Sequence, residues 1–442
     1  MVKGRSNYPT QSNPDATCDD CMGTGPDECD WCDTTCPYLD ARDEAMNADV
    51  GILNTAYLLN VWNRRPSMDG PFKGYRLVVV DECDLLESGL MGYAEVRITA
   101  ATIRRYKLGY PDRKTVRESW LAWAEATPSK LGSRLARVGG NSLRAQRERK
   151  RLARMIAEVK HLATELADED SKWVYSPEGD AIVFKPVTVS QLGESHLWRW
   201  SDRFLLMSAS IISADQMAAD LGIPEDWEYE TVTVPSTFPV ANRPIHVVNV
   251  GSMGRKTAEA TTPRLLAAVT RIVERHPGER VLVHTVSYRL AQIVGDHLTR
   301  HLDTRIVVTY TDGAGREAAL NRYLGTPGAV MVAPSMDRGV DLPGDMCRVQ
   351  VVAKVPYPSL GDEQIKARLY GTRGGKTWYA VQTVRTLVQM TGRGVRSADD
   401  RATTYILDGN FVGMFRQWKQ LFPTWWREAL EWDGTMRRTL DL

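Results

Sequence analysis

The sequence predicts an α/β protein with parallel sheets, in which a cysteine-rich segment and a helical insertion interrupt the first of two domains. Three observations predict this fold class. Residues 76–80 form an apolar, β-branched run that ends in Asp81 and Glu82, as is typical of a buried parallel strand with acids at its carboxyl end. Strand and helix patterns alternate over residues 245–391, which indicates βαβ units and a second parallel sheet. Five of the seven cysteines lie within residues 18–36.

Composition and charge agree with a folded chain of more than one domain. The 442 residues are 43% hydrophobic and 25% charged, with a formal net charge of +1, which excludes disordered and collagen-like proteins. The longest apolar stretches, such as residues 77–80, are far shorter than the roughly 18 residues needed to cross a bilayer. Residues 1–6 lack the apolar core of a secretory signal, so we expect a cytoplasmic protein that contacts no membrane.

The cysteine cluster predicts a metal centre sooner than disulfides, because no export signal accompanies it. Two C-x2-C pairs suit tetrahedral zinc, whereas an iron–sulfur cluster takes four thiolates at looser spacings, so spacing leaves the metal open. Two further cysteines, Cys83 and Cys347, stand in apolar surroundings and are expected in the core. The clustered cysteines are Cys18, Cys21, Cys29, Cys32 and Cys36.

The first domain is expected to alternate between helical and strand patterns. A helix is predicted over residues 41–61, a strand over 76–80, helices over 100–170, and strands over 181–184 and 203–210. The helical stretch contains a basic run that includes Arg147, Arg149 and Arg151, which is either a solvated helix face or a contact for nucleic acid. Paired prolines at residues 235–239 indicate a linker.

The second domain is expected to form a parallel sheet with a tryptophan-rich tail packed against it. Strands are predicted over residues 245–250, 281–284, 305–309, 329–333 and 348–353, and helices over 263–275, 288–302, 315–324 and 377–391.

Acidic and basic residues far apart in the sequence indicate phosphate chemistry. Asp81 and Glu82 suit an ATPase in which one carboxylate holds Mg²⁺ through water and the next orients the attacking water. Acidic pairs also end strands by chance, so this pair is weak evidence by itself. Arg393 and Arg396, three residues apart, are expected to share one helix face and to reach the charge that develops on a γ-phosphate.

Several ordered motifs resemble the XPD/DinG branch of superfamily 2 DNA helicases. They cover nearly the whole chain, and the helical stretch lies where this family carries its arch domain. The matching segments are residues 3–8 for motif Ia, 36–38 for the end of the iron–sulfur insertion, 81–84 for motif II, 208–210 for motif III, 281–288 for motif IV, 335–341 for motif V and 389–396 for motif VI.

The resemblance implies two RecA-like domains, the first incomplete at its N-terminus, and an ATP-dependent helicase of 5′ to 3′ polarity that acts on single-stranded or forked DNA. It implies domain 1 at residues 1–90 and 180–235, a cysteine-rich insertion at 17–37, an arch-like insertion at 91–179 and domain 2 at 236–442. The implied cofactors are ATP, Mg²⁺ and a [4Fe–4S] cluster, with Zn²⁺ as the alternative.

Residue roles follow by the same resemblance. Asp81 would hold Mg²⁺, and Glu82 would be the catalytic base. Motif VI would face the triphosphate, motif V would couple nucleotide to DNA movement, and motif Ia would lie beside the strand path, unless its residues merely close a strand–loop junction. The side chains concerned are Gln389, Arg393 and Arg396 in motif VI, Gly339 and Asp341 in motif V, and Arg5, Asn7 and Tyr8 in motif Ia.

The chain departs from the family pattern at several positions. Asp84 replaces the usual histidine of motif II, and Ser210 replaces the usual threonine of motif III. No G-x-x-x-x-G-K-[ST] phosphate loop precedes motif Ia, and residues 371–377 mimic only its ending, since Tyr370 stands where glycine is needed. The leading hypothesis is therefore a helicase portion that needs a separately supplied P-loop segment. The rival is a DNA-binding or regulatory module without ATPase activity.

Overall fold

A computed structural model describes residues 2–13, 15–21, 36–63, 76–140, 142–334, 336 and 342–432. The chain divides into two compact units. The first unit comprises residues 1–209, 215–228 and 359–375, and the second comprises 210–214, 229–358 and 376–442. Over the described ranges, no helix combines the length and the apolar content that a membrane span requires.

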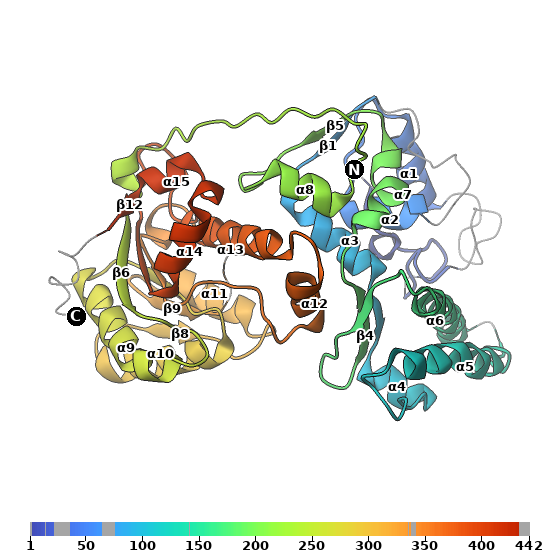
Figure 1. The fold of residues 1–442 in the computed structure, drawn as a ribbon. Coiled ribbons are helices and arrows are strands. Elements are labelled where there is room, and N and C mark those ends of the chain that lie inside the picture. The colour runs from blue at the N-terminus through green and yellow to red at the C-terminus, as the bar shows by residue number, and fades with distance from the viewer. Residues whose placement is uncertain are drawn as a thin grey trace. The chain divides into compact units, whose positions relative to one another are not determined.

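The first unit contains a short parallel sheet and a separate antiparallel one (Figure 1). Its helices are α1 (Pro37–Asn47), α2 (Thr55–Asn63), α3 (Leu86–Ala94), α4 (Ala100–Tyr106), α5 (Arg117–Leu135), α6 (Leu143–Ala167), α7 (Gly193–His196), α8 (Ala214–Leu221) and α12 (Glu363–Gly371), with 3-10 turns η1 (Arg5–Asn7), η3 (Cys83–Leu85), η4 (Ser190–Leu192) and η5 (Trp198–Trp200). Its strands are β1 (Val78–Val80), β2 (Val96–Ile98), β3 (Trp173–Tyr175), β4 (Ile182–Pro186) and β5 (Phe204–Leu206). The helix predicted over residues 41–61 is in fact two helices, α1 and α2, because residues 48–54 leave the helical conformation.

Strands β1 and β5 pair in parallel, with Val79 opposite Leu205. The strands predicted at residues 76–80 and 203–210 are therefore present and lie side by side. Val79 and Leu205 are both exposed, so the expectation of full burial for the β1 strand is wrong. Within the described residues, the parallel sheet of the first unit consists of the two strands β1 and β5.

The predicted helical insertion consists of α4, α5 and α6 on the antiparallel sheet β2–β4–β3. Trp120 is 1% exposed and lies at the centre of its core, against Trp123, Tyr175 and Phe184. Ser142 caps the long helix α6 by accepting the backbone N–H of Ala145. The predicted boundary at residue 179 assigned residues 180–186 to domain 1. Strand β4 instead pairs with β2 and β3, within the insertion.

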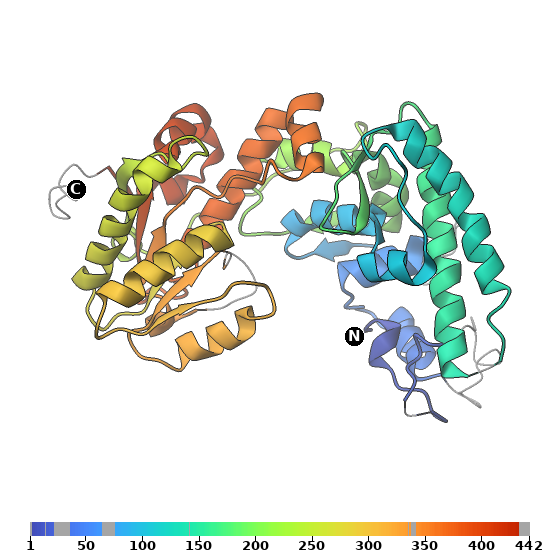
Figure 2. The same cartoon turned by 90° about the horizontal axis from the view of Figure 1, so that it is seen from below.

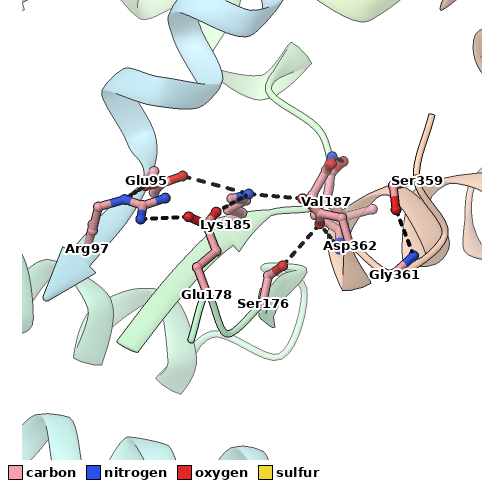
Figure 3. Close-up of polar contacts among 10 residues, drawn as sticks. Glu95, Arg97, Ser176, Glu178, Lys185, Val187, Ser359, Gly361 and Asp362 are labelled. Atoms are coloured by element: carbon pink, nitrogen blue, oxygen red, sulfur yellow. Dashed lines mark hydrogen bonds and ion pairs between the residues drawn. The ribbon is translucent and has the colours of Figure 1, made fainter. Parts of the chain in front are cut away.

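Helix α12 comes late in the sequence but packs on the first unit (Figure 3). Lys185 on β4 forms an ion pair with Asp362, with Nζ and Oδ2 3.0 Å apart. The Ser176 hydroxyl donates to the other carboxylate oxygen of Asp362 at 3.0 Å, and the Gln364 side chain donates to the Val187 carbonyl at 2.8 Å. The chain therefore leaves the second unit after residue 358 and returns to it at residue 376.

A buried charge cluster anchors α12 further. The Arg368 side chain is 3% exposed and pairs with Glu87 on α3 and with Asp220 on α8, the latter at 2.6 Å. Burial and the neighbouring Glu87 carboxylate raise the pKa of Asp220 to about 6. One buried cation therefore compensates two carboxylates.

The second unit is a seven-stranded parallel sheet with helices on both faces (Figure 2). Its strands are β6 (Ile245–Gly251), β7 (Val281–His284), β8 (Val307–Thr309), β9 (Val330–Ala333), β10 (Val349–Val352), β11 (Thr403–Asp408) and β12 (Leu430–Glu431), in the order β12-β6-β11-β10-β7-β9-β8. Its helices are α9 (Ala258–Arg275), α10 (Tyr288–His301), α11 (Arg316–Leu324), α13 (Gly375–Thr391), α14 (Asn410–Trp418) and α15 (Thr424–Glu428), with 3-10 turns η6 (Val240–Asn242), η7 (Gly344–Met346) and η8 (Lys419–Leu421).

The predicted second parallel sheet is confirmed. Helices α9 and α10 cover one face of the sheet, and α11, α13, α14 and α15 cover the other. Trp426 is fully buried and Trp418 and Trp425 pack beside it, as expected of a structural tail, while Trp432 is half-exposed. Strand β11, which lies between β6 and β10 in the sheet, was not predicted.

Candidate active site

The carboxyl end of β1 presents two exposed carboxylates. Asp81 and Glu82 follow the strand directly, and Asp81 Oδ1 accepts the Glu82 backbone N–H at 2.9 Å. Glu82 has φ 50° and ψ 45°, a left-handed conformation that non-glycine residues rarely adopt. Such strain is concentrated at functional sites, where the surrounding structure holds it in place.

The next two residues of motif II are buried and tie this turn to β5. Asp84 is 5% exposed and accepts the Ser208 hydroxyl at 2.7 Å. Cys83 donates its backbone N–H to the Met207 carbonyl at 3.0 Å. Hydrogen bonds thus connect motif II to β5 and to Ser208 of motif III within the first unit. Asp84, which replaces the usual histidine of motif II, accepts one of these hydrogen bonds. The predicted core positions of Cys83 and Cys347 are confirmed, since both are at most 1% exposed.

The last residue of motif III contacts motif VI within the second unit. The Gln389 side-chain amide donates to Ser210 Oγ at 2.7 Å, and Arg385 donates to the Ser210 carbonyl at 3.2 Å. Ser210 is 2% exposed. Within residues 208–210, the Ser208 hydroxyl is therefore hydrogen-bonded to motif II, and the Ser210 hydroxyl is hydrogen-bonded to motif VI.

The two arginines of motif VI do not share a helix face, so that expectation is wrong. Helix α13 ends at Thr391, and Arg393 and Arg396 lie in the loop that follows. Gly394 packs so closely here that an added Cβ would lie 2.4 Å from the Ala402 Cβ. The loop is therefore set by close packing.

A residue that sequence reasoning missed holds this loop. Asp400 is 7% exposed and accepts the backbone N–H groups of Gly344, Arg396 and Arg401 at 3.0–3.2 Å, as well as the Arg348 guanidinium at 2.5 Å. Burial acts to raise the pKa of Asp400, but these hydrogen bonds outweigh it and lower the pKa below its ordinary value. Asp400 is thus a positioning residue for Arg396. In the sequence, the one indication of this role is that an acidic residue stands four positions after Arg396.

Replacing Asp400 by asparagine is expected to destabilise the second unit by about 1–3 kcal/mol, because an amide nitrogen cannot accept the N–H groups that the carboxylate accepts. Urea unfolding measures this loss. The matched control is Asp345→Asn. Asp345 pairs with the same Arg348, but its side chain is 86% exposed, so this substitution should lower the free energy of unfolding by less than about 0.5 kcal/mol. Equal losses in the two variants would contradict the role assigned to Asp400.

Several predicted site residues fall outside the described ranges. They are Gly339 and Asp341 of motif V, and Cys29 and Cys32 of the cysteine cluster. The phosphate-loop mimic at residues 371–377 lies at the junction of α12 and α13 and follows no strand.

Two described cysteines of the cluster, Cys18 and Cys36, lie close together. The Sγ atoms of Cys18 and Cys36 are 3.9 Å apart, which is too far for a disulfide between them, and Cys21 is also buried. Two thiolates on one tetrahedral ion at about 2.3 Å would lie about 3.8 Å apart. Within the described parts of the chain, no group of three or more His, Cys, Asp or Glu residues is arranged to hold a metal ion.

The motif Ia residues pack against the cysteine segment. Tyr8 accepts the Cys18 backbone N–H through its carbonyl at 2.8 Å, and its ring meets that of Tyr38 edge-on. The Arg5 guanidinium lies 5.3 Å from the centre of the Tyr38 ring. Asn7 donates from its side chain to the Gly4 carbonyl at 3.0 Å. Arg5, Asn7 and Tyr8 are thus brought together beside the cysteines.

The basic helix α6 also contacts the cysteine segment. Arg147 pairs with Asp20 at 2.5 Å, and its guanidinium lowers the pKa of that carboxyl to about 2. Arg149 donates to the carbonyl groups of residues 138 and 140, and Arg151 lies 3.7 Å from Glu148. Arg147 and Arg149 therefore contact groups of the protein itself.

The chain is similar to known helicases in sequence and in fold. Residues 269–429 match the helicase C-terminal domain family. The chain is 24% identical over 240 residues to the ATP-dependent DNA helicase YoaA of Escherichia coli, a match that covers 52% of this chain and 37% of that protein. It is also 24% identical over 250 residues to the ATP-dependent DNA helicase DinG of Photobacterium profundum, covering 53% of this chain and 36% of that protein.

The chain thus spans little more than a third of the length of these curated relatives. Among solved structures, an XPD helicase is similar with a TM-score of 0.58 at 16% identity, covering 88% of this chain and 75% of that chain. Xpd4 of S. tokodaii is similar with a TM-score of 0.51 at 16% identity, covering 86% and 81%. These structural matches show the fold.

Proposed function

We propose that the chain, an XPD/DinG-like superfamily 2 helicase by these similarities, forms part of an ATP-dependent DNA helicase. One observation carries the proposal. Asp81 and Glu82 stand exposed at the carboxyl end of a parallel strand, where α/β sheets place their ligands, and Asp84 joins them to motif III. In this role Asp81 holds Mg²⁺ through water, and Glu82 accepts a proton from the attacking water.

The second unit supplies the positive charge for the reaction. Gln389 orients the motif III end, and Arg393 and Arg396 stabilise the charge that develops on the γ-phosphate. Gly339 and Asp341 couple nucleotide to DNA movement by the family resemblance. Translocation proceeds 5′ to 3′ on single-stranded or forked DNA.

The phosphates of ATP also need a cradle of backbone N–H groups and a lysine, which the 442 residues do not encode as G-x-x-x-x-G-K-[ST]. We therefore include a P-loop segment in addition to residues 1–442 in the proposal. Without it, Asp81 and Glu82 face a triphosphate with little compensating charge.

DNA contacts are assigned to the segment that contains motif Ia and to helix α6. Arg5 and Tyr8 offer a cation and a ring for phosphate contact and base stacking. On α6 the contact is proposed for Arg147, Arg149 and Arg151. Arg147 and Arg151 pair with Asp20 and Glu148 while about half of each side chain stays exposed, and Arg149 donates to backbone carbonyls.

The decisive experiment measures ATP hydrolysis by residues 1–442 with and without an added polypeptide that carries the P-loop segment. We expect negligible turnover by the chain alone, measurable single-strand binding, and DNA-stimulated turnover once the segment is added. A chain that binds DNA but gains no turnover from the segment would instead be the ATPase-inactive regulatory module.

Four of the five clustered cysteines are proposed to bind a [4Fe–4S] cluster, as in the family that the chain resembles. Anaerobic purification followed by iron, sulfide and zinc analysis is expected to give about four irons and four sulfides per chain. One zinc per chain without sulfide would identify the tetrahedral site that the 3.9 Å separation of Cys18 and Cys36 also suits. Absence of both metals would exclude either centre.

A further inference from the structure

The helical insertion is joined to the rest of the first unit by two short covalent connections. Strand β2 begins directly after Glu95, which follows the end of α3, and strand β4 leads through residues 187–189 to the turn η4. Helices α4, α5 and α6 pack on the sheet that contains both strands. The position of β4 therefore sets the direction of α6, the helix to which DNA contacts are assigned.

The segment that begins helix α12 contacts this insertion (Figure 3). Asp362 caps α12 by accepting the Gln364 backbone N–H at 2.8 Å, and it pairs with Lys185 on β4. Lys185 Nζ also lies 3.4 Å from a carboxylate oxygen of Glu178 and 3.9 Å from one of Glu95, and the Lys185 side chain is 12% exposed. The contact is thus a partly buried charge network, to which the α12 segment contributes the carboxylate of Asp362.

The other end of α12 contacts the helices that follow motifs II and III. Glu87 lies on α3, which directly follows the motif II turn, and Asp220 lies on α8, the first helix after motif III. Arg368 pairs with both carboxylates, and the three side chains are at most 13% exposed. Ion pairs that are buried in this way are screened little by salt. One arginine therefore links α12 to the segments that follow Glu82 and Ser208.

The helix between these two contacts fixes the distance between them. Asp362 and Arg368 are separated by six positions of one helix, which corresponds to about 9 Å along its axis. A helix that is held at both ends passes a displacement at one end on to the other, because its backbone hydrogen bonds keep its length constant. Residues 362–371 therefore connect β4 of the insertion to α3 as a rigid brace.

We propose that α12 braces the helical insertion against the motif II segment, and that Asp362 is a positioning residue through which DNA on the insertion stimulates ATP hydrolysis. DNA bound to α6 restrains the insertion, and Lys185 passes the restraint to Asp362. Arg368 then passes it to α3, which follows the motif II turn and Glu82. The link to hydrolysis rests on the proposed function, whereas the brace rests on the contacts of Asp362 and Arg368.

The first test measures how strongly single-stranded DNA stimulates ATP hydrolysis by the full chain supplied with the P-loop segment. Asp362→Ala should lower this stimulation by about fivefold or more, which is the lower end of typical coupling between two sites. The affinity for DNA should stay nearly unchanged, because Asp362 lies outside α6. Lys185→Met breaks the same ion pair from β4 and leaves the α12 cap intact, so it should give the same loss. The matched control is Glu363→Ala, which removes the neighbouring carboxylate, 48% exposed and paired with Lys366, and should leave the stimulation unchanged.

A second readout needs no hydrolysis and uses residues 1–442 without the P-loop segment. Adding oligothymidine should slow backbone hydrogen exchange in α6 and also in α3, because the brace connects them. In Asp362→Ala and in Lys185→Met, the exchange of α6 should still respond to DNA and that of α3 should not. A response of α3 that persists in both variants, or that is absent from the unmodified chain, would overturn the brace even if DNA stimulates hydrolysis. Loss of the α3 response in a chain that gains no hydrolysis from the P-loop segment would retain the brace and refute the proposed function.

Discussion

Glu82→Gln is expected to abolish DNA-stimulated ATP hydrolysis in the chain supplied with its P-loop segment, lowering kcat by about 100- to 10,000-fold. Glutamine keeps the size of the side chain but cannot accept a proton from the attacking water. Glu82 is exposed, so the change should leave folding and nucleotide binding nearly intact. Steady-state ATPase assays, together with ATP binding measured by calorimetry, separate the loss of chemistry from a loss of binding.

The control is Glu225→Gln, which removes an exposed carboxylate of the first unit outside motif II and should leave turnover unchanged. Robust turnover by residues 1–442 without a P-loop segment, surviving Glu82→Gln, would place the active site elsewhere in the chain.

Arg368→Met should destabilise the first unit by about 3–5 kcal/mol, because it leaves the buried carboxylates of Glu87 and Asp220 without a cation. Methionine preserves much of the side-chain volume, so the loss reports charge more than packing. The loss should be larger at pH 8 than at pH 5. At pH 5 Asp220, whose pKa is about 6, is largely protonated and needs less compensation.

The contribution of Asp220 to the pH dependence of stability can also be measured in the unmodified chain. Asp220 holds its proton to a higher pH in the folded state than in the unfolded state, so its contribution to stability is greatest below pH 3.8 and is lost as the pH rises through 6. Urea unfolding at both pH values measures the effect. Lys366→Met is the control on the same helix, because Lys366 is 51% exposed and its pair with Glu363 should contribute less than about 0.5 kcal/mol. A similar loss in both variants would mean that α12 is not held by the buried cluster.

Local pattern was a reliable guide wherever one element is read from its own residues. The strands at 245–251, 281–284, 330–333 and 349–352 were predicted within two residues of their bounds, because buried parallel strands are continuous apolar runs. The motif II carboxylates were found in the same way, since they directly follow such a run. Strand β11 was missed because its apolar run of Tyr405, Ile406 and Leu407 is short and flanked by Thr404 and Asp408, and no strand or helix was predicted after residue 391.

Spacing along the chain was enough to predict the α/β class, the parallel second sheet and the helices over residues 100–170. Folding in three dimensions was needed to show that α12 packs on the first unit, that β4 joins an antiparallel sheet, and that Asp400 holds the motif VI loop. It was needed equally to show that Arg393 and Arg396 lie beyond the helix and that Val79 and Leu205 are exposed. These features depend on contacts between residues distant in sequence, such as Arg368 with Glu87, and periodicity along the chain carries no information about such contacts.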